Sequence, residues 1–236
     1  MRYPYSAART NLTSIYVRIS NSKIGKGSFR ECLEGTYIGG NRNGQEAVCK
    51  RFKPQLRALE EEYFSRDFRV IEKAVEIADQ WNNFCDEGEE ILINKGSIHK
   101  CDSGIPYLVE PLIRYFTRFA SNGGWINHDE DDWRVVCMEA FSHFSYHESH
   151  GDLIICDLQG RYRFDKYTGR RSRFELTDPA ICSRDNCYGV TDLGWQGIES
   201  FFSNHQCNQF CQDHWSQPIN PLQYFPRTEG TVMTFH

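Results

Sequence analysis

One histidine and two cysteines near the end of the chain restrict its fold more than any other feature. His205 precedes Cys207 by two residues, and Cys211 follows four residues after Cys207. Residues four apart share a face of a helix, and a histidine at the start of that helix can approach the same point. Histidine and cysteine at such spacing are typical zinc ligands, and a closed structural site needs four ligands. The sequence therefore predicts a zinc ion in this segment, with one further ligand elsewhere in the chain.

The fourth ligand cannot be chosen from the spacing. Histidines and cysteines in the preceding and following segments are all candidates, namely His143, His147, His150, Cys182, Cys187 and His214. A closed set of four would make the metal structural. A catalytic zinc would instead keep one position open for water, with a base beside it. A zinc hydrolase is therefore the alternative interpretation of this cluster.

The cysteine content and the charge limit the class of protein. Ten cysteines in 236 residues would indicate disulfides in a secreted chain, but the opening residues MRYPYSAARTNLTS contain no apolar signal core. Metal binding and buried thiols explain the cysteines better. No apolar run is long enough to span a bilayer, and a net charge of −5 argues against a general nucleic-acid binder. We predict a soluble cytoplasmic protein without membrane insertion or a nucleic-acid partner.

The first half of the chain has the layout of a nucleotide-binding β-lobe. Alternating and apolar patterns predict strands at residues 14–20, 29–37 and 46–52, with a hairpin turn at 39–44. Gly25 and Gly27 predict a turn whose backbone amides can approach phosphates, and Lys50 supplies a positive charge to them. Arg30, beside this turn, is a candidate for a second phosphate contact. An ordinary surface hairpin with an exposed lysine is the alternative.

A helix and a proline-terminated strand follow. Apolar residues at steps of three and four predict an amphipathic helix over residues 55–83. Asp67 in this helix either orders nearby basic groups or is simply solvated. Residues 107–110 precede Pro111, which holds the chain extended and donates no hydrogen bond. We interpret this strand as a hinge between two lobes that reads an adenine edge, with Glu110 accepting from the adenine amino group. The alternative is an edge strand that ends in an ordinary turn.

A second helix is predicted after the acidic residues 129–132, because acids suit a helix N-terminus. Its expected buried stripe consists of Trp133, Val136, Cys137, Ala140, Phe141 and Phe144. His143 lies on or beside this stripe. A single histidine in that position is more often a hydrogen-bonded core residue than a metal ligand.

Polar side chains then follow a short apolar strand at residues 152–156. Alternation along an extended segment places Asp157 and Gln159 on one side, and Asp178 stands in a Thr-Asp-Pro turn further on. Carboxylate and amide oxygens are hard ligands that suit Mg²⁺. Two acids and an amide are a reasonable set for holding Mg²⁺-ATP and a hydroxyl nucleophile. Acids at strand ends are common, however, so this set alone is not specific.

Eight motifs in a fixed order give the chain a resemblance to the α-kinase family of atypical protein kinases. They are GSFREC, AVCKRF, YLVEP, FSHFSY, DLQG, LTDPAI, YGVTDLGWQG and FFSNHQCNQFC, and together they cover roughly residues 20–215. The resemblance implies an α+β, two-lobed, protein-kinase-like fold. Residues 1–110 would form a mainly β, nucleotide-binding N-lobe, and residues 111–236 a catalytic, zinc-containing α+β C-lobe.

The resemblance also implies roles for the residues that match these motifs. Lys50 would contact the ATP phosphates and serve catalysis, and Glu110 would lie at the adenine hinge. Asp157 would be the catalytic acid, and Gln159 and Asp178 would bind Mg²⁺. The expected activity is that of a serine/threonine protein kinase, with ATP, Mg²⁺ and a protein substrate as its partners. A zinc-stabilised pseudokinase that only binds partners is the alternative.

The resemblance implies the fourth zinc ligand, and the chain departs from the family pattern at two places. It selects His143 as the fourth ligand beside His205, Cys207 and Cys211. The loop from Gly189 to Gly194 resembles the family's GxAxxG segment, thought to shape the peptide-binding side, with Thr191 in place of alanine. Residues 161–175 replace a shorter link and are basic and aromatic. They are predicted to be either a solvated loop or a dock for acidic substrates or phosphate.

Overall fold

The computed structural model describes residues 16–26, 30–85, 89–100, 104–127, 133–164 and 171–229. These residues group into two compact units. The first contains the described residues up to Phe68 together with Asn94–Leu112, and the second contains Arg69–Ile93 and the described residues from Ile113 onward. The predicted division at residue 110 places residues 69–93 in the N-lobe, whereas this grouping places them in the second unit.

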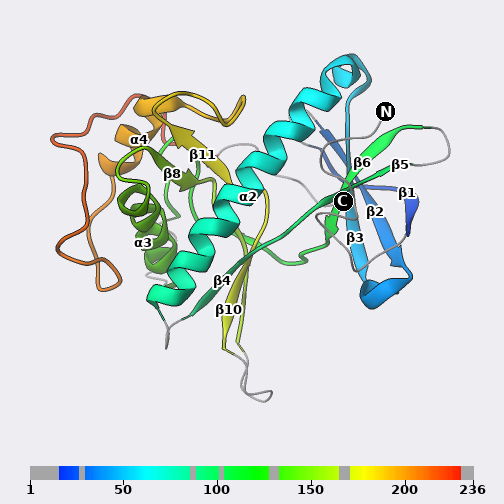
Figure 1. Ribbon diagram of the computed structural model, residues 1–236, viewed down its shortest axis with the longest axis horizontal. Coiled ribbons are helices and arrows are strands. Elements are labelled where there is room, and N and C mark those ends of the chain that lie inside the picture. Colours follow the sequence, from blue (N-terminus) through cyan, green and yellow to red (C-terminus); the bar gives the residue numbers. More distant parts are fainter. Residues whose placement is uncertain are drawn as a thin grey trace. The chain divides into compact units, whose positions relative to one another are not determined.

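The first unit is built on a five-stranded antiparallel sheet with the order β1-β2-β3-β6-β5 (Figure 1). Its strands are β1 (Tyr16–Lys26), β2 (Arg30–Ile38), β3 (Glu46–Phe52), β5 (Ser97–Lys100) and β6 (Pro106–Pro111). A 3-10 turn, η1 (Gly40–Arg42), lies in the predicted hairpin between β2 and β3. The prediction of a turn at Gly25 is wrong, since irregular pairing with β2 continues β1 as far as Lys26. Gly27 lies outside the described residues.

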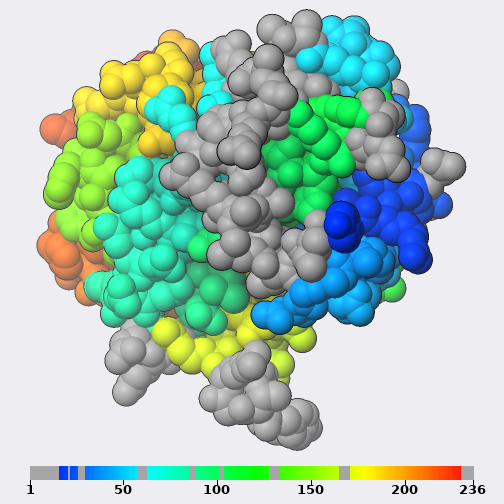
Figure 2. Space-filling view, turned by 45° about the vertical axis from the view of Figure 1, so that its right-hand side comes forward, coloured from blue at the N-terminus to red at the C-terminus, as the bar shows by residue number. Residues whose placement is uncertain are grey.

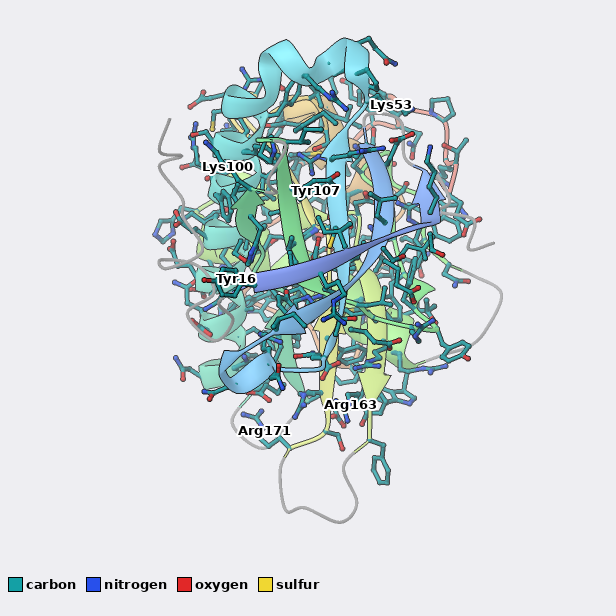
Figure 3. All side chains as sticks on the ribbon, turned by 90° about the vertical axis from the view of Figure 1, so that its right-hand side faces the viewer. Tyr16, Lys53, Lys100, Tyr107, Arg163 and Arg171 are labelled. Carbon is teal, nitrogen blue, oxygen red and sulfur yellow. The ribbon has the colours of Figure 1, made fainter. Side chains whose placement is uncertain are left out.

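The two faces of this sheet bury different side chains because residues alternate along each strand. One face carries an apolar cluster of Leu33, Tyr37, Ala47, Cys49, Tyr107 and Val109; Tyr107 is labelled in Figure 3. The other packs Phe52, Ile98 and Leu108 against Phe64 and Phe68. The last two belong to the helix α2 (Glu60–Phe84), which follows the 3-10 helix η2 (Pro54–Leu59). The amphipathic helix predicted for residues 55–83 is therefore confirmed, apart from its 3-10 start.

The second unit combines two sheets with two further helices and the part of α2 from Arg69 onward. A four-stranded sheet has the order β4-β10-β9-β7, and a two-stranded sheet pairs β11 with β8. Their strands are β4 (Glu90–Ile93), β7 (Thr117–Arg118), β8 (Leu153–Cys156), β9 (Gln159–Arg163), β10 (Arg173–Leu176) and β11 (Ala180–Ser183). The helix α3 (Trp133–Glu148) packs against β8, and α4 (Gly194–Phe202) packs against β11 (Figure 1).

The helix α3 is buried on most of its circumference. Every residue from Cys137 to Tyr146 except Glu139 is buried, which is typical of a helix inside a core. The predicted stripe is wrong at Trp133, which is exposed at the helix start and packs edge-on against Tyr162 at 5.0 Å. Val135 is buried instead, so a single stripe describes this helix poorly.

Gly160 allows β9 and β10 to pair closely. A Cβ atom at this position would lie 2.1 Å from the carbonyl oxygen of Glu175 and 2.9 Å from Cα of Leu176, so a side chain would force the strands apart. We expect Gly160→Ala to lower the free energy of unfolding by about 3 kcal/mol, measured by chemical denaturation. Gly44→Ala is the control, because its site is open and its φ of +80° alone should cost only about 1 kcal/mol. Equal losses in the two variants would contradict this explanation.

Among the described residues, no helix has the length and apolar character needed to cross a membrane.

Candidate functional site

In the first unit, Lys50 and Glu110 form a buried ion pair between neighbouring strands. Lys50 lies on β3 opposite Leu108, and Glu110 lies on β6 opposite Val48, so both side chains project from the same sheet face. The Lys50 Nζ atom contacts Glu110 Oε1, and the two side chains are only 4% and 3% exposed. The sheet therefore holds one ammonium group in a fixed position beside the strand that we interpret as a hinge.

Arg30 lies on the same face of the sheet, opposite Phe52. Its guanidinium lies 4.4 Å from the centre of the Phe52 ring and forms an ion pair with Asp67 of α2. Of the two alternatives for Asp67, the structure therefore shows the one in which it pairs with a nearby basic group. The first unit brings together the three residues predicted to contact the nucleotide, Lys50, Glu110 and Arg30, on one face.

In the second unit, two strand ladders meet where Asp157, Gln159 and Asp178 lie. Asp157 directly follows Cys156, which pairs with Ala180 of β11. The carbonyl of Gln159 accepts a hydrogen bond from the Thr177 amide at 3.0 Å. Asp178 therefore lies between Thr177, which is hydrogen-bonded to Gln159, and Ala180, which pairs with the residue before Asp157. The structure brings together the three side chains that the sequence proposed for one chemical role, although the basic stretch 161–175 separates two of them from the third.

Asp157 and Asp178 both have left-handed backbones, with φ of 51° and 49°. This region is sparsely populated by residues other than glycine, although aspartate tolerates it better than most. Each such residue costs of order 1 to 3 kcal/mol and persists where the surrounding structure imposes it. The strand pairing on either side of these two residues supplies that constraint. The position of each carboxylate therefore depends on a strained backbone conformation.

Arg118 is a member of this site that sequence reasoning missed. It pairs with Gln159 in the β7–β9 ladder, and its Nη2 donates to Asp157 Oδ1 at 2.7 Å. Its Nη1 donates to the carbonyl oxygen of Glu229 at 2.7 Å. Arg118 and Asp157 are 39 residues apart in the sequence, and no local pattern connects them. The guanidinium fixes the orientation of the carboxylate and balances its charge.

The surroundings of Asp157 raise the pKa of its carboxyl above the ordinary value. Burial raises the pKa of this carboxyl to about 6; the Arg118 guanidinium opposes the rise, and the negative charge of Asp178 adds to it. Because the charge of Asp178 acts on Asp157, a divalent cation bound between the two carboxylates would relieve their repulsion.

The predicted zinc residues also lie together in the second unit. The ligand atoms of His143, His205, Cys207 and Cys211 all lie within 4.8 Å of one another. His143 Nδ1 lies 3.2 Å from His205 Nε2 and 3.7 Å from Cys207 Sγ, and Cys211 Sγ lies 3.8 Å from His205 Nε2. Tetrahedral zinc bound to nitrogen and sulfur would separate neighbouring ligand atoms by about 3.3 to 3.8 Å. The four side chains therefore fit a zinc ion.

His143 is oriented through its other ring nitrogen, whereas the Nδ1 atom of His205 has no hydrogen-bond partner among the described residues. His143 Nε2 lies 3.0 Å from the carbonyl oxygen of Ser216, so this nitrogen is the donor and Nδ1 keeps its lone pair. His205 Nδ1 lies 3.6 Å from Glu139 Oε1 on α3. A hydrogen-bonded carbonyl fixes the tautomer and the ring orientation of a metal-binding histidine. Ser216 is thus a supporting residue that the sequence pattern did not reveal, and Glu139 lies beside His205 without a hydrogen bond to it.

Burial sets the protonation of the cluster. It lowers the pKa of His143 to about 4, with a further lowering from the charge of His205, so the ring is neutral near pH 7. Burial raises the pKa of the Cys211 thiol to about 11. A metal ion binding here would find a neutral imidazole and would displace a proton from Cys211.

The segment with the two cysteines is a loop after α4, so the prediction of a helix there is wrong. The Cys211 amide donates to the carbonyl oxygen of Asn208 in a turn, and Asn208 Nδ2 donates to the carbonyl oxygen of Val136 on α3 at 3.1 Å. Side-chain bonds of asparagine to backbone compete with helix formation. Asn208 therefore fixes the loop against α3 and brings both thiols to the histidines.

Asp192 organises the glycine-containing loop that resembles the GxAxxG segment. Its carboxylate accepts hydrogen bonds from the amide and hydroxyl of Ser183, at 2.8 and 2.6 Å, and from the amides of Tyr188 and Gly194. The side chain is 9% exposed. Sequence reasoning passed over this residue, although an aspartate two positions before a glycine is a common turn signal.

Comparison with known proteins identifies a family. The sequence model of the Alpha-kinase family matches residues 25–211. Alpha-protein kinase 1 of Dictyostelium discoideum is 43% identical over 218 residues, which cover 89% of this chain and 14% of that protein. Myosin heavy chain kinase B of the same organism is 27% identical, and the match covers 92% of this chain. The match to eukaryotic elongation factor 2 kinase of Rattus norvegicus is 25% identical over the same share.

The chain spans 28% of the length of myosin heavy chain kinase B and 29% of the elongation factor 2 kinase. Among solved structures, an alpha kinase from Entamoeba histolytica is 26% identical and has a TM-score of 0.64, with coverage of 93% of this chain and 85% of that one. The alpha-kinase domain of myosin-II heavy chain kinase A in complex with AMP-PNP is 20% identical and shares the fold, with a TM-score of 0.66. That match covers 86% of this chain and 90% of the other.

Proposed function

The chain belongs to the alpha-kinase family of protein kinases, and from this we propose that it transfers the γ-phosphate of ATP to a serine or threonine hydroxyl of a protein substrate. The observation that carries the proposal is the grouping of Asp157, Gln159 and Asp178 at the meeting of two strand ladders, with Arg118 holding the first carboxylate. This set supplies a group to orient a hydroxyl and oxygen ligands for a divalent cation.

In the proposed reaction, the substrate hydroxyl oxygen forms a bond to the γ-phosphorus while the bond to the β-phosphate oxygen breaks, leaving ADP. The Asp157 carboxylate orients the hydroxyl and accepts its proton, and Arg118 holds that carboxylate in place. Gln159 and Asp178 offer oxygen atoms to Mg²⁺, which neutralises charge on the phosphates when it is bound. Most of the rate enhancement comes from positioning and charge neutralisation.

The first unit supplies a charge for the nucleotide. Lys50 is the proposed phosphate contact, and Glu110 holds it in position as an acid on a helix does in other protein kinases. Glu110 and the backbone of β6 are proposed to border the adenine, and Arg30 is proposed as a second phosphate contact. Nucleotide binding agrees with the solved relatives, since alpha-kinase domains of myosin heavy chain kinase A have been determined in complex with ADP and AMPPCP.

Because Lys50 and Glu110 are buried as a pair, their substitutions should affect both activity and stability. We expect Lys50→Met to abolish phosphotransfer and to lower the free energy of unfolding by about 3 to 5 kcal/mol, because Glu110 loses its cation partner. The double variant Lys50→Met/Glu110→Gln should recover most of the stability and none of the activity. Thermal unfolding and phosphate transfer measured on both variants test this. Recovered activity in the double variant would exclude Lys50 from the reaction.

We further propose that His143, His205, Cys207 and Cys211 hold a structural zinc ion. Four protein ligands whose atoms lie within 4.8 Å of one another would fill a tetrahedral site and leave no open position for water, which argues against the zinc hydrolase alternative. The pseudokinase alternative has no support in the described residues, since the side chains expected for catalysis are present.

The proposal is tested by incubating the chain with Mg²⁺ and ATP labelled on the γ-phosphate, together with peptides whose only hydroxyl is serine, threonine or tyrosine. We expect label on serine or threonine peptides. Label on tyrosine alone would overturn the assignment of specificity, and nucleotide binding without any transfer would favour the pseudokinase.

A further inference from the structure

The outer face of the β9–β10 hairpin gathers three arginines around one carboxylate. Arg161 Nε and Nη2 lie 2.8 and 2.7 Å from Glu175 Oε2. Arg163 Nη1 and Arg173 Nε lie 3.3 and 3.1 Å from the other oxygen, Oε1. Both oxygens of this glutamate are thus already engaged, and the positive charge around it exceeds the charge it offers.

The strand register makes this arrangement unfavourable by itself. Arg163 stands directly opposite Arg173 in the β9–β10 ladder, and like charges in that position are destabilising. Glu90 lies opposite Arg173 on the other side, in β4, and even with it the face carries more arginines than acids. Over residues 161–175 the sequence has six basic side chains and two acidic ones, within a chain whose net charge is −5. Among the described residues of this face, three arginines stand beside two acids, Glu175 and Glu90, which leaves an excess of one positive charge.

The arginines are not required for the core of the hairpin. Phe174 and Leu176 point to the opposite face and are fully buried there, while the side chains of Arg163, Arg161 and Arg173 are 54%, 34% and 18% exposed. The yellow-green atoms of this part of the chain lie on the surface in Figure 2, and Figure 3 labels Arg163 near the end of β9. Arg171 has a separate structural role, since it donates to the carbonyl oxygens of Asn82 and Cys85 at the end of α2.

We propose that the face formed by Arg161, Arg163 and Arg173, which we term the arginine face, docks an acidic segment of a protein partner. Glu175 occupies the point on which the three guanidiniums converge, so a single phosphate group placed there would meet a carboxylate. The three arginines are spread along two strands, β9 and β10. A row of aspartate or glutamate side chains matches this spread better than one compact anion.

The arginine face deepens the proposed function if the acidic segment belongs to a substrate of the kinase. The excess charge would raise the local concentration of substrates that carry such a segment, and the effect would weaken as salt increases. None of the three arginines is part of the proposed catalytic set. Docking and phosphate transfer can therefore be tested separately.

The test is the binding of a fluorescein-labelled peptide of eight glutamates, compared with eight glutamines, measured by anisotropy at low and high salt without nucleotide. We expect only the glutamate peptide to bind, and Arg163→Glu to weaken it by at least about fivefold, since the new charge repels the peptide. This variant should remain folded, because it places opposite charges at the Arg163–Arg173 pair. Lys95→Glu, an exposed site with the same charge change, should alter the affinity less than twofold.

Equal affinities for the two variants would overturn the proposal. Inorganic phosphate and chloride should be compared at the same ionic strength. If phosphate displaces the peptide and chloride does not, the proposal would also be overturned, in favour of a phosphate site. As a second readout, phosphate transfer to a threonine peptide with a glutamate tail should show a lower KM than transfer to one with a glutamine tail, and Arg163→Glu should remove this difference. Absence of transfer to either peptide, with binding intact, would contradict the proposed kinase function and leave the docking surface supported.

Discussion

Replacing Cys211 by serine is expected to reduce the metal content of the purified chain from about one zinc ion to almost none and to unfold much of the second unit. A structural zinc contributes about 10 to 16 kcal/mol of apparent binding free energy in small zinc domains, whereas a whole domain is stable by only about 5 to 15 kcal/mol. His143 packs against Phe202 and Trp215, so losing the metal would disturb an aromatic cluster around it. Elemental analysis and thermal unfolding would measure the two effects.

The matched control for this substitution is Cys187→Ser. Cys187 is also partly buried in the second unit, but its sulfur lies beside the hydroxyl of Ser183 and outside the metal cluster. We expect this variant to keep its zinc and most of its stability, and we expect a strong chelator to reproduce the effect of Cys211→Ser in the unmodified chain. A structural metal would be contradicted if the purified unmodified chain held no zinc and unfolded cooperatively at the same temperature as the Cys211→Ser variant.

Replacing Asp157 by asparagine is expected to lower kcat by about 10² to 10⁴-fold, because a positioned proton acceptor contributes about that much. Asparagine keeps the shape of the side chain, and its carbonyl oxygen can still accept from Arg118. Burial disfavours the charged form of Asp157, whose pKa is raised to about 6. A neutral replacement should therefore leave the chain at least as stable near pH 7. We expect the affinity for Mg²⁺-ATP to change little.

Activity and nucleotide binding, measured on the same preparation, separate the role of Asp157 from a general defect. Asp152→Asn is the control, since Asp152 is an exposed aspartate whose carboxylate lies 3.7 Å from the Arg184 guanidinium. It should keep full activity. A fall in kcat of less than threefold in Asp157→Asn would contradict its assignment as the group that accepts the hydroxyl proton.

Sequence patterns predicted the elements that carry the site because these elements are short and strongly constrained. Alternation and burial predicted β3 over the same residues that it occupies, and the apolar run ending at Cys156 predicted β8 to within one residue. Asp157 and Gln159 follow that run directly, so their grouping is local. Their meeting with Asp178 depends on the pairing of β9 with β10 across the basic stretch, which alternation alone does not determine.

Contacts between distant segments account for what the sequence could not show. Lys50 meets Glu110, and Asp157 meets Arg118, through strand register rather than spacing. The loop that bears Cys207 was expected to be helical because the two cysteines stand four residues apart, a spacing that a turn fixed by Asn208 also satisfies. Spacing limits which ligands can share a metal, but it does not specify the backbone that joins them.

The proposed activity is magnesium-dependent phosphate transfer, in which the side chains at the meeting of the two ladders of the second unit act together with Lys50 of the first unit. The most direct test is the transfer of γ-phosphate from ATP to a threonine peptide, measured with and without Mg²⁺ for the unmodified chain and for Asp178→Ala. We predict transfer by the unmodified chain only when Mg²⁺ is present, and none above background by Asp178→Ala, with both proteins folded and zinc-loaded. Full activity of Asp178→Ala would contradict the claim.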